Sequence, residues 1–203
     1  MGRIGLFGGT FDPPHKGHIE LAKKVLADFS LDKVIFLPAG NPPHKQENHK
    51  TDKLHRFNMV KIAVDGNDDF FVSDYDTKNE KPNYSYITIR YFKGQFPDDE
   101  IFFIIGADSL RDFPFWKNYK ELLTLCKFIV VPRPNVPKED YYKNFDKDDD
   151  LSAFLFVKDF FYDLSSTDLR KNLTKDELPH GVYEYIKENR LYPKHAGVEP
   201  RMV

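Results

Sequence analysis

Gly8-Gly9-Thr10-Phe11-Asp12-Pro13-Pro14-His15-Lys16-Gly17-His18 is the stretch of this sequence that decides the fold. It follows a short apolar run, residues 4–7, and it precedes apolar residues that recur at helical spacing between positions 19 and 29. The pattern predicts a first strand, a turn, and a first helix, with the quoted residues at the carboxyl end of the strand.

The chemistry of the turn is that of a phosphate site. Gly8 and Gly9 let the backbone approach a ligand, and the free N–H groups at a helix start favour an anion. His15 and His18 are three residues apart, so both can lie at this entrance, where imidazolium groups would donate hydrogen bonds to phosphate oxygens. Thr10 adds a hydroxyl group. The stretch matches neither the Walker A pattern nor G-x-G-x-x-G.

Strand-like and helix-like segments alternate along the rest of the chain. Apolar runs predict strands over residues 4–7, 34–37, 70–73, 101–105, 128–131 and 153–157. Helical spacing predicts helices over residues 19–29, 54–64, 84–92, 119–125, 167–173 and 182–189. Six strands separated by helices predict an α/β fold, a Rossmann-like open parallel sheet with helices on both faces.

In such a sheet, ligands bind outside the carboxyl ends of the strands. This rule indicates the loops at residues 8–18, 38–45, 106–109 and 132–133. Lys45 follows the second strand and is a candidate for contact with phosphate or substrate. Gly106 and Asp108 follow the buried strand at 101–105; Asp108 is equally suited to cap a helix.

A second anion site is expected at Ser165-Ser166-Thr167-Asp168-Leu169-Arg170. Ser166 or Thr167 can cap a helix there, and Arg170, about one turn later, can reach back to a phosphate as a planar fork. If the fold brings this helix start near the one that carries His15 and His18, the two helix starts form a clamp around a triphosphate.

Composition excludes several classes of protein. The chain has 203 residues, 30 Lys plus Arg, 32 Asp plus Glu and a net charge of −2, so it lacks the basic field of a nucleic-acid-binding protein. Its single cysteine, Cys126, excludes an intrachain disulfide and a cysteine-based zinc site. We expect no metal held by side chains, since His44, His49 and His55 are unevenly spaced.

The same data indicate how the chain is organised. We expect a single domain over residues 1–203, with a C-terminal helical part at about 165–192 and a tail at 193–203. There is no secretion signal and no apolar run of membrane-spanning length, so we expect a cytoplasmic protein that binds no membrane. Residues 135–150, rich in acids, are expected to form a solvated loop.

The quoted motifs carry a resemblance. His15-x-Gly17-His18 after Gly-Thr-Phe-Asp-Pro resembles the signature of the nucleotidylyltransferase superfamily, and the longer string resembles bacterial nicotinate-nucleotide adenylyltransferases. The Gly-Ala-Asp-Ser-Leu segment at 106–110, with a tryptophan at position 116, is similar to that family, as are Arg133-Pro134 and the segment at 165–170. The resemblance extends from about residue 4 to about residue 192.

The resemblance implies a reaction: transfer of AMP from ATP, with Mg²⁺, to nicotinate mononucleotide, in an enzyme that can assemble into a homo-oligomer. It implies that His15, His18 and Arg170 act on the phosphates, and that Gly17 leaves room for the adenosine. The remaining ATP contacts would come from Gly8, Gly9, Thr10, Lys45, Gly106, Asp108 (ribose), Arg133, Ser166 and Thr167. The mononucleotide would contact Ser85, Tyr86, Ile87 and Trp116, the last by stacking on the pyridine ring.

One segment departs from the family pattern, which carries Ser-Tyr-Thr followed by Asp-Thr where this chain has Ser85-Tyr86-Ile87-Thr88. A main-chain contact with the mononucleotide would survive this change, whereas a contact through a threonine hydroxyl group would not. Nicotinamide mononucleotide and phosphopantetheine remain alternative acceptors. A nucleotide-binding sensor without catalytic activity is an alternative from another class, disfavoured because His18 and Arg170 are both present.

Overall fold

The computed structural model of the chain describes residues 1–40, 51–80, 83–132, 136–160, 162 and 165–192. Within these residues, six parallel strands form one sheet in the order β3-β2-β1-β4-β5-β6. The strands are β1 (Arg3–Gly9), β2 (Lys33–Pro38), β3 (Phe70–Val72), β4 (Glu100–Gly106), β5 (Lys127–Val131) and β6 (Phe154–Phe156). The predicted α/β fold with an open parallel sheet is confirmed.

The sheet is apolar on both faces. Along β4, Phe102 and Ile104 enter one core, whereas Ile101, Phe103 and Ile105 enter the other. Because successive side chains of a strand point to opposite faces, a strand covered on both sides must be apolar at every position. This requirement explains the unbroken run at residues 101–105.

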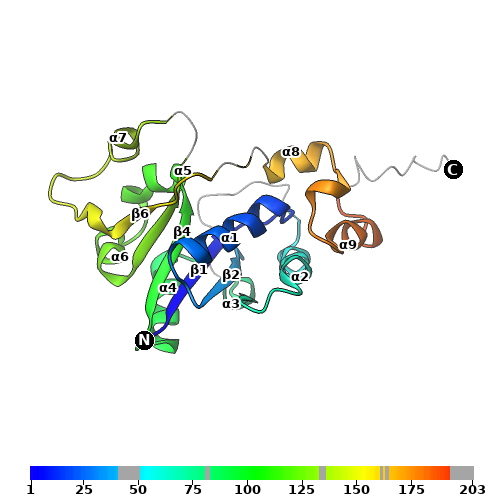
Figure 1. Cartoon of the computed structure of the whole chain (residues 1–203), viewed down its shortest axis with the longest axis horizontal. Coiled ribbons are helices and arrows are strands. Elements are labelled where there is room, and N and C mark those ends of the chain that lie inside the picture. Colours follow the sequence, from blue (N-terminus) through cyan, green and yellow to red (C-terminus); the bar gives the residue numbers. More distant parts are fainter. Residues whose placement is uncertain (41–50, 81–82, 133–135, 161, 163–164, 193–203) are drawn as a thin grey trace.

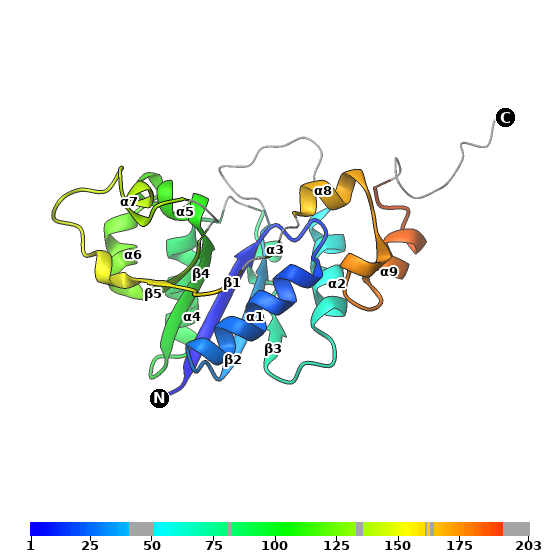
Figure 2. The same ribbon diagram turned by 45° about the horizontal axis from the view of Figure 1, so that its top comes forward.

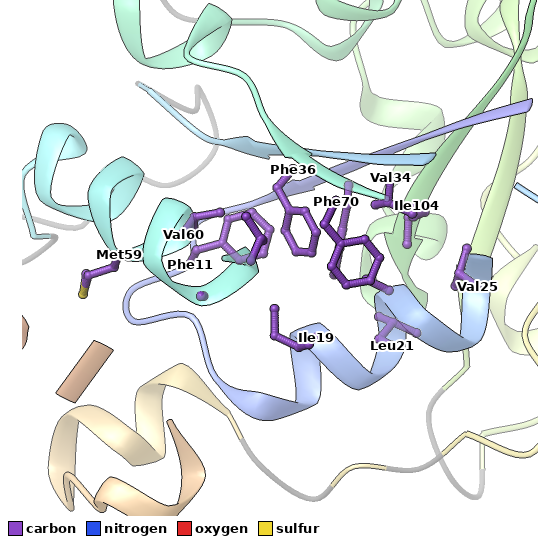
Figure 3. Close-up of a cluster of buried hydrophobic side chains, with 14 of the residues drawn as sticks. Phe11, Ile19, Leu21, Val25, Val34, Phe36, Met59, Val60, Phe70 and Ile104 are labelled. Atoms are coloured by element: carbon purple, nitrogen blue, oxygen red, sulfur yellow. The ribbon is translucent and has the colours of Figure 1, made fainter. Parts of the chain in front are cut away.

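Helices cover each face. The first core lies between the sheet and α1 (Lys16–Asp28), α2 (Lys53–Val64) and α9 (Val182–Glu188), and Figure 3 shows its side chains between the sheet and the first two helices. The second core lies beneath α4 (Ser85–Gln95), α5 (Ala107–Arg111), the 3-10 turn η1 (Phe113–Phe115) and α6 (Tyr119–Leu125). Figure 1 shows the two groups on either side of the sheet.

All six predicted helices are present, including the one expected over residues 84–92. The sequence missed several short elements. They are α3 (Tyr75–Lys78), α5, η1, α7 (Lys138–Tyr141), η2 (Leu151–Ala153) and η3 (Lys175–Glu177). The remaining helix, α8 (Ser166–Lys171), lies close to the start of α1 in both views (Figures 1 and 2).

The prediction that residues 135–150 form only a solvated loop is wrong in one respect. Its segment contains α7, and Tyr141 is buried against the second core because its ring stacks on Phe156 at a centroid distance of 6.2 Å. The acidic side chains of the segment remain at the surface, where Asp146 pairs with Lys120 at 2.9 Å, so both aromatic packing and surface polar contacts anchor the segment.

The order of the strands creates a natural binding crevice. The chain runs outward from β1 to β2 and β3, and then returns to β4 on the other side of β1. The loops that follow β1 and β4 therefore leave the sheet in opposite directions, and a crevice opens between them. Among the described helices, none combines the length and apolar character that crossing a membrane requires.

Candidate active site

A cleft of about 610 Å³ opens at this crevice. Most of its walls come from residues that follow β1 and β4 and from the start of α4. Its lining includes Gly8, Gly9, Thr10, Leu37, Ala39, Asp76, Asn83, Tyr84, Ser85, Gly106, Asp108, Asp112, Phe115, Trp116 and Lys117. Seven residues predicted from the sequence lie on it: Gly8, Gly9, Thr10, Ser85, Gly106, Asp108 and Trp116.

The turn between β1 and α1 is held by a buried aromatic residue. Phe11 has a left-handed φ of 51° and is 2% exposed, and its ring packs on Phe7 at a centroid distance of 5.4 Å and on His18 at 5.0 Å. A Cβ atom on Gly9 would lie 2.8 Å from the Phe11 ring. Gly9 is therefore required by the packing of Phe11 as well as by access to the cleft.

His15 and His18 lie together at the start of α1, as predicted. Their ring centroids are 3.7 Å apart, and the His15 backbone N–H donates to His18 Nδ1 at 3.1 Å. That bond places the proton of a neutral His18 ring on Nε2. Burial lowers the pKa of His15 to about 4, and burial together with the His15 charge lowers the pKa of His18 well below its usual value.

The two rings are consequently neutral at pH 7 in this structure, whereas the sequence analysis expected imidazolium groups. Two adjacent histidines in a site with little water cannot both hold a proton, because each charge loses hydration and repels the other. A neutral imidazole still donates one N–H. The buried His15 Nδ1 has no hydrogen-bond partner among the residues that the structure describes.

Gly17 contacts an aromatic ring. A Cβ atom at this position would lie 2.5 Å from Cδ1 of Tyr162 and 3.0 Å from His15 Nδ1. The Tyr162 ring lies nearly parallel to that of His15, with the centroids 6.2 Å apart, and its hydroxyl donates to Glu177 at 3.2 Å. In this conformation, Tyr162 occupies the space next to Gly17 that was expected to admit adenosine.

The second predicted anion site meets the first. Ser165 caps α8 by accepting the Asp168 N–H, one residue earlier than expected, and this leaves the Ser166 hydroxyl free to donate to the Pro13 oxygen at 2.9 Å. Arg170 donates to the Asp12 main-chain oxygen at 2.7 Å and to the Thr167 hydroxyl at 3.1 Å. The fold thus joins the two motifs.

Sequence reasoning missed a buried arginine that organises the turn. Arg56 of α2 is 2% exposed and donates to the main-chain oxygens of Thr10, Gly40 and Thr51 at 2.9, 3.2 and 3.0 Å. Burial lowers its pKa, and the nearby Asp12 carboxylate opposes that change. Arg56 therefore ties the loop after β1 to the loop after β2.

Asp12 completes this buried network. Its side chain is also buried and accepts hydrogen bonds from the Thr51 N–H at 3.2 Å and from the Tyr192 hydroxyl at 2.5 Å. Burial and the Asp12 charge raise the pKa of Tyr192, which keeps that hydroxyl protonated as a donor. The C-terminal end of the described chain is thereby joined to the first turn.

A carboxylate also lies in the opposite wall of the cleft. Asp76 Oδ1 accepts hydrogen bonds from the Thr88 hydroxyl at 2.9 Å and from the Asn83 amide at 2.8 Å. Burial raises the pKa of Asp76, and these two hydrogen bonds oppose the rise. The contacts hold Tyr84 and Ser85, which lie between the two donors in sequence, against the cleft.

Two of the predicted mononucleotide contacts have side chains that do not line this cleft. Tyr86 and Ile87 are absent from the lining of the cleft; Tyr86 packs on the second core, and Ile87 is 40% exposed. Because α4 begins at Ser85, its helical geometry turns the next two side chains away. Tyr84, which was not predicted, lines the cleft in their place.

Trp116 is half-buried at the cleft, with its ring centroid 5.2 Å from that of the fully buried Phe113. Asp108 lies in the first turn of α5, 4.0 Å from the Arg111 guanidinium. The predicted contacts Lys45 and Arg133 lie outside the described residues. Within the described residues there is no group of three or more His, Cys, Asp or Glu side chains suited to hold a metal ion.

These features define a class: an α/β nucleotide-binding protein whose anion-binding turn follows the first strand, next to the point where the strand order reverses. The family model described as cytidylyltransferase-like matches residues 6–172. The chain belongs to this family, and the resemblance drawn from the motifs is confirmed.

Curated relatives agree. The chain is 39% identical to a probable nicotinate-nucleotide adenylyltransferase of Clostridium tetani, over 95% of this chain and 100% of that protein. It is 38% identical to the nicotinate-nucleotide adenylyltransferase of Bacillus subtilis, over 95% and 99%. The fold is similar to that of Plasmodium falciparum nicotinic acid mononucleotide adenylyltransferase complexed with NaAD, with a TM-score of 0.76, 21% identity, and coverage of 95% and 98%.

Proposed function

We propose that this protein is a nicotinate-nucleotide adenylyltransferase, which transfers AMP from ATP to nicotinate mononucleotide and so produces deamido-NAD and pyrophosphate in NAD biosynthesis. The observation that carries the proposal is the junction of the two motifs, in which Ser166 and Arg170 hydrogen-bond to Pro13 and Asp12. The names and the nearly full-length coverage of the curated relatives support it.

The reaction needs no covalent enzyme intermediate. A phosphate oxygen of the mononucleotide attacks the α-phosphorus of ATP in line, a new P–O bond forms, and the bond to the β-phosphate oxygen breaks to release pyrophosphate. Positioning and stabilisation of charge then supply the catalysis. Cys126 is not a candidate nucleophile, because burial raises its pKa to about 12.

The phosphates of ATP are assigned to the predicted residues around the two joined motifs. His18, with its proton on Nε2, donates to an oxygen of the reacting phosphates, and His15 offers the second ring next to it. Thr10, Ser166, Thr167 and Arg170 hold the triphosphate, with Lys45 and Arg133 as further contacts. Gly8, Gly9 and Gly106 keep the floor of the cleft open.

The bases bind at opposite ends of this site. The adenosine lies against Gly17, which requires the Tyr162 ring to move or to stack on the base, and Asp108 binds a ribose hydroxyl. The pyridine ring stacks on Trp116, and the cleft wall at Ser85 lies beside it. Tyr84 replaces Tyr86 and Ile87 as a candidate contact.

Mg²⁺ enters with ATP. We propose that the phosphates supply most of its ligands and that it keeps several water molecules. A cytoplasmic location, a single domain and assembly into a homo-oligomer stay predictions from the sequence.

A pyrophosphate-release assay with ATP and Mg²⁺ tests the proposal, with nicotinate mononucleotide, nicotinamide mononucleotide and phosphopantetheine as acceptors. We expect release with the nicotinate form and far less with the others. Activity with phosphopantetheine alone would overturn the choice of acceptor. ATP binding without release with any acceptor would instead indicate a sensor.

A further inference from the structure

Lys117 occupies a position in the cleft to which nothing above assigns a role. It directly follows Trp116, it is exposed, and it lines the cleft together with Tyr84 and Ser85. Its Nζ lies 4.7 Å from the centroid of the Tyr84 ring. The side chain therefore reaches from the segment before α6 to the first residues of α4, and it spans the part of the cleft next to the tryptophan.

Lys117 differs in charge from the other ionisable residues of the described cleft lining. The other charged residues among its described lining are Asp76, Asp108 and Asp112. Arg111 lies close to two of them, 4.0 Å from Asp108 and 3.5 Å from Asp112. Lys117 is the one cationic side chain in the described lining, and within the described part of the chain it forms no ion pair.

The backbone next to Lys117 favours the same kind of ligand. Tyr84 is the N-cap of α4, a helix of 11 residues, and no side chain caps it. The first N–H groups of a helix lack intrahelical partners and attract negative charge. The ammonium group and this helix start therefore combine into a site for an anion at the pyridine end of the cleft.

On this basis, and resting on the proposed function, we propose that Lys117 selects the acid over the amide form of the mononucleotide by pairing with the pyridine carboxylate. A carboxylate and a carboxamide have nearly the same shape, so a pocket separates them by charge and by hydrogen-bond donors. The carboxylate has two oxygens, which can accept from Nζ and from an N–H group at the start of α4, whereas the amide has one oxygen and would turn its N–H₂ toward the other donor.

Before a mononucleotide binds, the cation–π contact keeps Lys117 Nζ near the Tyr84 ring. Such a contact is weak at an exposed site, and a lysine side chain is flexible, so a carboxylate can recruit the ammonium group at little cost. Asp76, a carboxylate of the cleft lining, accepts from Thr88 and Asn83 through Oδ1 and forms no ion pair with Lys117 within the described part of the chain.

The test compares wild type with Lys117→Met, which keeps the length of the side chain and removes its charge. For nicotinate mononucleotide we expect KM to rise about 10- to 100-fold with kcat nearly unchanged, the range of a hydrogen bond to a charged group. For nicotinamide mononucleotide and for ATP, KM should stay within about threefold, and Lys117→Arg should retain most of the preference.

Lys120→Met is the matched control. Lys120 is exposed three residues further on, lies 5.8 Å from the centroid of the Tyr119 ring, pairs with Asp146 at 2.9 Å, and is not part of the cleft lining. Its loss removes the same charge without touching the cleft, so the acid-to-amide ratio should not change. A fall in the acid-to-amide ratio for both variants would mean that any positive charge in this region favours the acid. That result would overturn the proposal.

An acid-to-amide ratio that is unchanged in a folded, active Lys117→Met enzyme would also overturn it. Calorimetric titration of each mononucleotide provides a readout that does not depend on turnover. Failure of the proposed function looks different, because in that case wild type itself would release no pyrophosphate with either pyridine mononucleotide.

Discussion

The guanidinium group of Arg170 donates a hydrogen bond of 2.7 Å to the main-chain oxygen of Asp12, which precedes it by 158 residues. The same guanidinium lies 3.9 Å from the Asp12 carboxylate. Two segments from opposite ends of the chain thus meet in one hydrogen-bonded unit beside His15 and His18, and the unit can be perturbed by single substitutions.

Arg170→Lys should not be a mild change. Lysine keeps the charge but loses the planar fork that serves Asp12 and Thr167 at once, so we expect the KM for ATP to rise about tenfold, with less effect on the mononucleotide. Steady-state kinetics with each substrate varied checks this. Lys171→Met, at the next and exposed position, is the control; unaltered ATP dependence in Arg170→Lys would remove this residue from the ATP site.

His18→Ala should lower kcat by about 10²–10³-fold while the KM for the mononucleotide changes little, since a donor to developing charge is lost. His18→Asn is the sharper variant, because its side-chain oxygen can replace Nδ1 as acceptor of the His15 N–H, yet it lacks the Nε2 proton. We expect the same loss of kcat from a protein with an intact turn. Near wild-type rates would exclude His18 from the mechanism.

The buried His15 should make folding dependent on pH. Its pKa falls from 6.5 to about 4 on folding, so between these values the unfolded chain binds a proton that the folded chain does not. The free energy of unfolding should therefore fall as the pH decreases from 6.5 to 4, by roughly 3 kcal/mol at most from this group.

Urea titrations of wild type and His15→Asn across this range test that expectation. The stability of the variant relative to wild type should improve steadily toward pH 4. His180→Asn, at an exposed histidine outside the site, reports the effect of removing any histidine. Parallel pH profiles for wild type and His15→Asn would show that burial of His15 does not govern its protonation.

Trp116→Ala and Phe113→Ala separate stacking from core packing. Phe113 is fully buried and Trp116 lies beside it at the cleft. Phe113→Ala should cost about 3–5 kcal/mol of stability. Trp116→Ala should cost clearly less and should raise KM for the mononucleotide with ATP binding unchanged. A large fall in Tm with an unchanged mononucleotide KM would assign Trp116 to the core instead.

Asp76→Asn should leave the protein at least as stable as wild type at pH 7. Burial raises the pKa of Asp76, so wild type loses stability as the pH rises above 3.8 toward the folded-state value, and the amide keeps an oxygen for Thr88 and Asn83. Asp76→Ala leaves the buried Thr88 hydroxyl without its acceptor and should cost about 1–3 kcal/mol. Thermal unfolding of both variants at pH 7 and pH 4 distinguishes these outcomes.

The strands and the two anion-binding motifs were predictable because their signals are local. The run at residues 101–105 and the spacing of His15, Gly17 and His18 each lie within a few positions in sequence. The contact between the two motifs could not be predicted from the sequence, because the fold of the entire sheet brings Arg170 and Asp12 together.

The buried polar groups were not predictable for a physical reason. Arg56 occurs in a helix with other charged residues, where an arginine normally faces solvent, and its burial depends on carbonyl groups from loops distant in sequence. Asp76 likewise depends on Asn83 and Thr88. The positions of the Tyr86 and Ile87 side chains outside the cleft lining were not predictable either, because the side on which α4 faces the cleft depends on the residue at which the helix begins.

The buried guanidinium of Arg56 makes the glycine-rich turn unsuited to modular exchange. A hybrid gene with its crossover between residues 18 and 56 would combine the turn of one parent with the α2 helix of another. If the second parent lacked the arginine, the Thr10 and Gly40 carbonyls would lose their donor and the Asp12 carboxylate one of its two nearby cations. Recombination among related enzymes should therefore preserve the turn and α2 as a single inherited block.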